Sequence, residues 1–185
     1  MDIFSHAFWS AVAAKSANSK IKPFKKRPMN VVWATIWGVA PDIFAFTPVI
    51  ISVALSFLLD GGNISAFKID RPSDIEPMGA DTLFIYRLTR QLYDIGHSAI
   101  IFAAVFAIVA LLFRKPKWVM LGWLFHILID IPTHSYKFYP TPVFWPLSSR
   151  EFNGISWATP WFLILDVSAI IIVSLIYFLK RKKRI

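Results

Sequence analysis

Long apolar runs that carry almost no charge are the feature that most constrains how this 185-residue chain folds. Residues 29–59 contain a single charged side chain, Asp42, and residues 159–179 also contain one, Asp166. Runs of about 17–25 apolar residues match the length of a helix that crosses a bilayer. The chain is 56% hydrophobic, which is more than in ordinary soluble domains. With no β pattern or repeat in the sequence, we predict an all-α, polytopic membrane helical bundle of about four to five transmembrane helices, with residues 1–185 as a single domain.

The predicted crossings follow the apolar runs. They are residues 2–18, 29 to about 50, 97–113, 118–131 and 159–179. We expect a break at Pro41-Asp42, because a proline inside a helix removes a backbone donor and clashes with the preceding turn. Residues 60–96, with a short amphipathic helix at 83–94, and residues 132–158 are the predicted outer-side loops.

Lysine and arginine are concentrated in three short segments. Residues 15–27, 114–117 and 180–184 hold fourteen of the twenty basic side chains and none of the eleven acidic ones. Because the cytoplasmic loops of membrane proteins are enriched in basic residues, we place these segments, including the basic tail 180–185, in the cytoplasm. The net charge of +9 is then explained by topology, and nucleic acid is not an expected partner. The prediction is a multi-pass protein of the cell (inner) membrane, with its N-terminus outside and its C-terminus cytoplasmic.

His126 and Asp130 stand four residues apart in an otherwise apolar run. On a helix this spacing stacks both side chains on one face. The pair can bind one metal ion, or the carboxylate can orient the imidazole from outside the metal shell. The alternative is a polar pair buried between helices. Gly122 lies on the same stripe and allows another helix to approach closely, while Pro132 ends or bends the helix just before His134.

Ionisable side chains occur at a similar depth in all five predicted crossings. At about 1.5 Å per helical residue they lie roughly 20–25 Å from the nearest basic segment, with one at about 13 Å. They are His6, Asp42, His97, Asp130 and Asp166, with His126 at the smaller depth. Because an Asp near the centre of a span costs about 2.5–3.5 kcal/mol, such groups normally pair or line a cavity. The predicted metal ligands are His6, Asp42, His97, His126 and Asp130.

Imidazoles combined with carboxylates favour Zn²⁺, then Mn²⁺ or Fe²⁺, and the absence of cysteine excludes thiolate ligands. His134 is assigned either to a second metal or to a loop contact. Asp166 is either a ligand, a group close behind the ligands, or a hydrogen-bond partner of a neighbouring helix, and Asp94 is a further candidate for the metal or its surroundings. Arg150 is a candidate for binding a substrate phosphate or for anchoring at the interface. Ser98 is expected to cap a helix.

Five short motifs follow one another along the chain. They are Ser5-His6, Pro41-Asp42, Gly96-His97-Ser98, His126 with Asp130 and Thr133, and Phe144-Trp-Pro-Leu-Ser148 with the nearby Arg150. In this order they resemble the predicted membrane-bound metal-dependent hydrolases of the YdjM-like inner-membrane family. The chain departs from that pattern at Phe44, where the family often has a second Asp, and at Tyr93-Asp94, where His-Arg is frequent. A fainter likeness, confined to the HxxxD helix with scattered His and Asp, is to zinc-dependent phospholipase C and P1-type nucleases and suggests phosphoester hydrolysis.

The leading interpretation is a membrane-embedded metal-dependent hydrolase. Its substrate would be a phosphoester or a lipid-linked molecule that enters from the outer leaflet. An alternative from another class is a transporter or channel for a divalent metal or protons, which would use the same His and Asp residues and need an exit on the cytoplasmic side. A third is a non-catalytic scaffold with a structural metal, whose coordination shell would be closed.

The topology can be tested with a reporter fused after Ile185. We expect a cytoplasmic location, because three basic segments without acidic residues bias the adjoining ends toward the cytoplasm. A pair of fusions, to one reporter that works only in the cytoplasm and one that works only outside it, measures the location. Activity of the outside reporter alone would overturn the topology and the common depth that depends on it.

Overall fold

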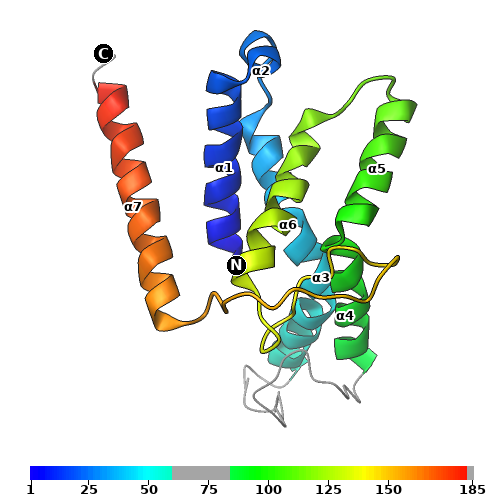
Figure 1. The fold of residues 1–185 in the computed structure, drawn as a ribbon. Helices are drawn as coiled ribbons and strands as arrows, with labels where there is room; N and C mark the ends of the chain where they lie inside the picture. The colour runs from blue at the N-terminus through cyan, green and yellow to red at the C-terminus, as the bar shows by residue number, and fades with distance from the viewer. Residues whose placement is uncertain (60–83, 183–185) are drawn as a thin grey trace.

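The structure, a computed structural model, describes residues 1–59 and 84–182. Within these ranges the chain forms helices and two isolated bridges but no strand. The helices are α1 (Ile3–Lys20), α2 (Lys22–Lys26), α3 (Val31–Leu59), α4 (Phe84–Gly96), α5 (Ala99–Leu112), α6 (Leu121–Thr133, after the 3-10 turn Trp118–Met120) and α7 (Pro160–Lys182) (Figure 1). The predicted all-α class is confirmed, and α4 matches the amphipathic helix expected at 83–94.

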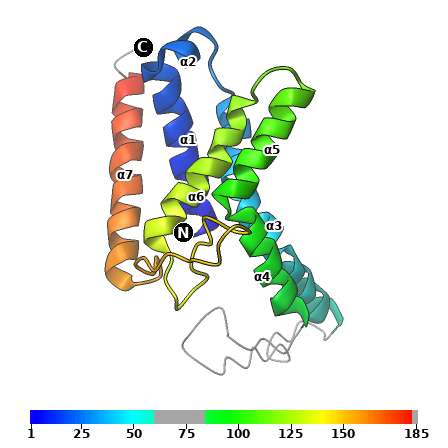
Figure 2. The ribbon, with the colours of Figure 1, turned by 45° about the vertical axis from the view of Figure 1, so that its right-hand side comes forward.

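Helix α3 is the centre of the bundle. It packs against α1 and α6 near Gly38, and against α4 near Ala45, where Ala45 and Tyr93 share a buried apolar cluster. Helix α7 runs beside α1 (Figure 2). The carboxyl end of α1 with α2, the turn between α5 and α6, and the carboxyl end of α7 all lie at one end of the molecule, at the top of Figure 1. The described parts of the three basic segments therefore share one end of the bundle.

Small side chains line the faces on which α1, α3 and α6 meet. A Cβ atom added at Gly122 of α6 would lie 2.0 Å from the carbonyl oxygen of Ala34 in α3. A Cβ atom added at Gly38 of α3 would lie 2.0 Å from the Oγ atom of Ser10 in α1. Small residues at helix contacts are typical of membrane bundles, in which backbones pack closely. The close approach predicted at Gly122 is present.

This close contact determines where the polar side chains lie. His6, Asp42 and His126 each stand one helical turn away from a small residue of the contact, which is Ser10, Gly38 or Gly122. Side chains four residues apart project from the same face of a helix. The three helices therefore direct their polar side chains into one place beside their point of closest approach.

The predicted break at Pro41-Asp42 was wrong. Helix α3 continues through both Pro41 and Pro48 to Leu59. Its neighbours α1, α6 and α4 pack along it, and tertiary packing stabilises a helix more than local propensity does. Helices inside membranes tolerate proline for the same reason. Continuity keeps Asp42 on the buried stripe that also contains Gly38 and Ala45.

Among the described residues, α3 and α7 are long and apolar enough to cross a membrane. Helices α4 and α5, bent by 62° at their junction, make a third span if they count as one. The helix of residues 118–133 is apolar but shorter. Large apolar side chains are exposed along α3, α5 and α7, as on a surface that faces lipid.

Residues 134–159 form an irregular connection from α6 to α7 that closes the end of α6. The backbone N–H groups of Gly154, Ile155 and Trp157 donate to the carbonyls of His134, Pro132 and Thr133. These bonds satisfy acceptors that the end of a helix leaves open. Helix α6 thus extends two residues beyond Ile131, its predicted end. The predicted outer loop 60–96 lies outside the described residues as far as residue 83, as does the basic tail beyond residue 182.

Replacing Gly122 by alanine is expected to destabilise the bundle, because the new methyl group would meet the Ala34 backbone at 2.0 Å. Gly96→Ala is the matched control, since its Cβ atom would find its nearest neighbour, the Pro41 carbonyl oxygen, at an ordinary 3.4 Å. We expect the free energy of unfolding to fall by about 1–3 kcal/mol for Gly122→Ala and by less than about 0.5 kcal/mol for Gly96→Ala. Thermal unfolding of both variants in detergent measures the difference, and equal melting temperatures would contradict the packing described.

Candidate metal centre

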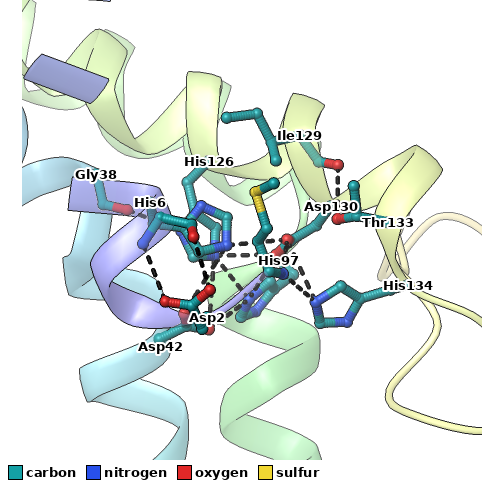
Figure 3. A network of polar contacts seen from close by, with 12 residues as sticks. Asp2, His6, Gly38, Asp42, His97, His126, Ile129, Asp130, Thr133 and His134 are labelled. Carbon is teal, nitrogen blue, oxygen red and sulfur yellow. Dashed lines mark hydrogen bonds and ion pairs between the residues drawn. The ribbon is translucent and has the colours of Figure 1, made fainter. Parts of the chain in front are cut away.

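Four buried side chains meet at the centre of the molecule. Asp42 comes from α3, His97 from the corner between α4 and α5, and His126 and Asp130 from α6. Each offers one ligand atom, and these atoms lie within 4.8 Å of one another. His6 of α1 joins them, with its Nε2 atom 3.0 Å from Asp130 Oδ1 and 3.9 Å from Asp42 Oδ2. The structure therefore brings together all five side chains that the sequence singled out as metal ligands (Figure 3).

Backbone carbonyls fix the orientation of three imidazoles. The Nδ1 atoms of His97, His126 and His134 lie 3.0, 2.8 and 2.9 Å from the carbonyl oxygens of Tyr93, Gly38 and Tyr139. Because a carbonyl oxygen can only accept, each Nδ1 carries the hydrogen and donates it. In a neutral ring the Nε2 atom is then left with a free lone pair. Histidines that bind metals usually have this arrangement, in which an outer hydrogen bond sets the tautomer and the direction of the ring.

The Nε2 atoms of His97 and His126 lie only 3.0 Å apart. Two unprotonated nitrogens at this distance face each other lone pair to lone pair, which is unfavourable unless a proton or a cation lies between them. With ligand distances of about 2.0–2.2 Å, neighbouring donors around one ion should be roughly 3.0 Å apart at right angles and 3.4 Å apart in a tetrahedron.

The distances from the carboxylate oxygens to these nitrogens also match the separations expected around one ion. Asp42 Oδ1 lies 3.4 Å from His97 Nε2 and 3.6 Å from His126 Nε2. Asp130 Oδ2 lies 3.4 and 3.1 Å from the same two nitrogens. Two imidazoles and two carboxylates at these separations fit the coordination shell of a single divalent ion.

Charge also favours a cation here. Asp42 and Asp130 are 4% and 0% exposed, and burying carboxylates is costly unless opposite charge compensates them. The amino group of Met1 lies 2.8 Å from Asp130 Oδ1. The ion pairs that Asp42 makes in the described part of the chain are with imidazoles. One ammonium against two carboxylates leaves negative charge that a divalent ion would neutralise.

The two remaining acidic candidates, Asp166 and Asp94, have other partners than the cluster. Asp166 of α7 accepts hydrogen bonds from Ser5 Oγ at 2.6 Å and from Trp9 Nε1 at 2.8 Å. Asp166 thus joins α7 to α1, which is the alternative in which it bonds to a neighbouring helix. Asp94 pairs with Arg90 at 3.0 Å on α4, and Arg90 also pairs with Glu151. Neither carboxylate belongs to the cluster.

His134, Arg150 and Ser98 take different positions. His134 reaches the cluster from the end of α6, with Nε2 3.3 Å from Asp130 Oδ1 (Figure 3). Arg150 is exposed, and its backbone N–H donates to Ser148 Oγ, so the structure does not bring its side chain to the cluster. Ser98 caps α5 by accepting from the backbone of Ile100 and Ile101, as predicted.

Sequence reasoning missed four groups that shape the site. Asp2 caps α1 by accepting from the backbone N–H groups of Phe4 and Ser5, and an aspartate just before the first apolar helix was a usable capping signal. Tyr93 stacks on His97 with ring centroids 3.7 Å apart, and its spacing of one helical turn from His97 was also readable. The carbonyl of Gly38 gave no signal because every residue has one, and the amino group of Met1 gave none because it belongs to the backbone and not to a side-chain type.

A cavity of about 340 Å³ borders the cluster on the side of the irregular connection. Its lining residues are Met1, Asp2, Ile3, Phe4, Asp42, Phe46, His134, Phe138 and Trp157. Asp42 and His134 bring polar cluster atoms to a wall that is otherwise largely apolar. Phe138 and Trp157 of the irregular connection line this cavity, whereas Tyr136 and Phe144 of the same connection are exposed.

These features define a helical membrane protein with a buried group of two histidines and two aspartates that could hold a metal ion. The chain belongs to the YdjM inner membrane protein family, whose family model matches residues 1–185. No curated protein and no solved structure matches it. The resemblance carried by the five sequence motifs is thereby confirmed at the level of the family, and the membrane location agrees with the family's description.

Proposed function

We propose that this protein is a membrane-embedded metal-dependent hydrolase that acts on a phosphoester or on a lipid-linked substrate. The observation that carries the proposal is the pair of Nε2 atoms of His97 and His126, 3.0 Å apart and facing two carboxylates. Their Nδ1–H groups are already committed to carbonyls, so the cluster is prepared to receive a cation.

The residues have distinct roles in this proposal. His97, His126, Asp42 and Asp130 would hold the ion, for which zinc is the first choice and manganese or iron the next. A bound divalent ion lowers the pKa of a coordinated water to about 7 and polarises a phosphoryl oxygen. The carbonyls of Gly38 and Tyr93 hold the imidazoles in place, and Tyr93 excludes water from one face of His97 by stacking on it.

The cavity supports the proposal of a hydrolase over that of a scaffold. Structural metal sites usually close their coordination shell with protein ligands, whereas catalytic sites keep one position open. Here Asp42 and His134 line a cavity of about 340 Å³. Phe4, which is 85% exposed, forms part of its rim, so an apolar chain could approach from the lipid along α1. An anionic head group would then face the cluster, and a lipid-linked phosphoester has both parts.

The packing on the basic side argues against a transporter. A route for metal ions or protons toward that side would need polar groups, yet the cavity there, of about 210 Å³, has Ser10 as the one polar side chain in its lining. The contacts at Gly38 and Gly122 separate that cavity from the cluster. In this proposal the basic end lies in the cytoplasm, as the distribution of basic residues predicts, and the cavity beside Phe4 opens toward the outer leaflet.

Asp130→Asn is the most direct test of this function, with Asp166→Asn as its matched control. Both aspartates are less than 9% exposed and both accept hydrogen bonds, but Asp166 does so outside the cluster. We expect Asp130→Asn to lower metal affinity by more than the roughly 10–100-fold that follows the loss of a group hydrogen-bonded to a ligand. The variant should also lose hydrolysis of bis(p-nitrophenyl) phosphate. Asp166→Asn should keep both.

Metal content per chain, measured by elemental analysis, and phosphodiester turnover are determined on the same samples. Equal metal in both variants would show that Asp130 is not a ligand. A metal-loaded parent with no turnover toward phosphodiesters or phospholipids would remove the hydrolase and leave only a metal site.

A further inference from the structure

The two oxygens of Asp130 face different pairs of imidazoles. Oδ2 lies 3.4 Å from His97 Nε2 and 3.1 Å from His126 Nε2. Oδ1 lies 3.0 Å from His6 Nε2 and 3.3 Å from His134 Nε2. A carboxylate placed between two nitrogen pairs in this way has the geometry of a bridge between two cations.

The two oxygens of Asp42 also face different histidines. Oδ1 faces His97 and His126 at 3.4 and 3.6 Å, whereas Oδ2 is the oxygen nearer to His6, at 3.9 Å. Each carboxylate therefore presents one oxygen to the His97–His126 pair and the other to His6, whose ring stacks on His126 with centroids 3.8 Å apart (Figure 3). Both pairs belong to the same buried cluster.

On the His6–His134 side, the Nε2 atoms of both rings face Asp130, and that of His134 also faces the Met1 amino group. His6 is fully buried, its Nε2 atom faces Asp130 Oδ1 at 3.0 Å, and its Nδ1 atom has no hydrogen-bond partner among the described residues. A buried polar atom without a partner is costly, and most have one. The Nδ1–H group of His134 is bound to the Tyr139 carbonyl, so its Nε2 lone pair is directed inward. A cation beside both Nε2 atoms would replace the Met1 amino group as the partner of His134 and coordinate His6 as well.

A positive charge already lies at this position. The amino group of Met1 is 2.8 Å from Asp130 Oδ1 and 2.7 Å from His134 Nε2. These are hydrogen-bond distances, and a divalent ion in the same place would need its ligands at about 2.0–2.2 Å. The atoms that accept from the Met1 ammonium, Asp130 Oδ1 and His134 Nε2, thus define a second cation position beside the first.

We propose that the cluster binds two divalent metal ions bridged by the carboxylates of Asp42 and Asp130, the first held by His97 and His126 and the second by His6 and His134. This inference rests on the metal centre of the proposed function, to which it adds a second metal ion. The ions in such pairs lie about 3.5–4 Å apart. Two divalent ions against two carboxylates give the site a net positive charge beside the cavity, which suits an anionic phosphoester.

The full-length protein, stripped of metal and reloaded, tests the proposal by stoichiometry. We expect two Zn²⁺ per chain in the parent and one in His134→Ala, because the first position keeps all its ligands. In that variant the Tyr93 hydroxyl still donates to the Tyr139 carbonyl at 2.7 Å, which retains one anchor of the loop. Arg150→Ala, an exposed change outside the cluster, is the control and should keep two ions.

Mn²⁺ loading of the unaltered parent gives an answer that does not depend on any variant folding. Two ions sharing carboxylate bridges should show a spin-coupled electron paramagnetic resonance spectrum at two equivalents, in place of the six-line signal of isolated Mn²⁺. One ion per chain in both parent and His134→Ala, with an uncoupled spectrum, would overturn the second position while leaving the first intact. Two ions retained in His134→Ala would overturn the assigned ligands. No ion in the parent would overturn both the second position and the proposed function.

Discussion

The structure depends on the carboxylate of Asp130, which is buried completely between two pairs of imidazoles. An aspartate in an apolar surrounding is costly, so the helices that carry its partners must reach it. They can do so because α1, α3 and α6 meet through small residues, with Gly122 against the Ala34 backbone and Gly38 against Ser10. The polar side chains lie one turn beyond these contacts. The small residues at these contacts therefore determine both the close packing of the helices and the convergence of the polar side chains. A change that separates the helices also separates the ligands.

Much of the site could be predicted from the sequence because helical geometry relates residue number to depth. The rise per residue placed His6, Asp42 and His97 near one level, and the spacing of His126 and Asp130 put both on one face. The errors arose where tertiary contacts override local rules. Proline usually ends a helix, but α3 continues through Pro41 because its neighbours support both halves. Backbone groups were not predictable from sequence either. The Gly38 carbonyl and the Met1 amino group contact the cluster through atoms that no residue type identifies.

The surroundings of the cluster are asymmetric, and this asymmetry bears on function. Toward the basic end, the contacts at Gly38 and Gly122 and an apolar cavity separate the cluster from the ends of α1 and α2. Toward the other end, Asp42 and His134 border a cavity whose remaining wall is mainly aromatic and aliphatic. A polar cluster open on one side and closed by helix packing on the other is suited to a molecule that enters and leaves by the same route. The proposed hydrolase needs only such a single route, whereas a transporter would need access from both sides.

X-ray absorption at the metal edge of the purified, unaltered protein tests the central claim most directly, because it reads the atoms around the ion. The account predicts bound zinc, manganese or iron with a first shell of nitrogen and oxygen at about 2.0–2.2 Å. It also predicts the multiple-scattering pattern of imidazole from at least two histidines, as the orientation of His97 and His126 requires. A metal shell of oxygen without imidazole, or a protein that binds none of these ions when they are supplied, would contradict it.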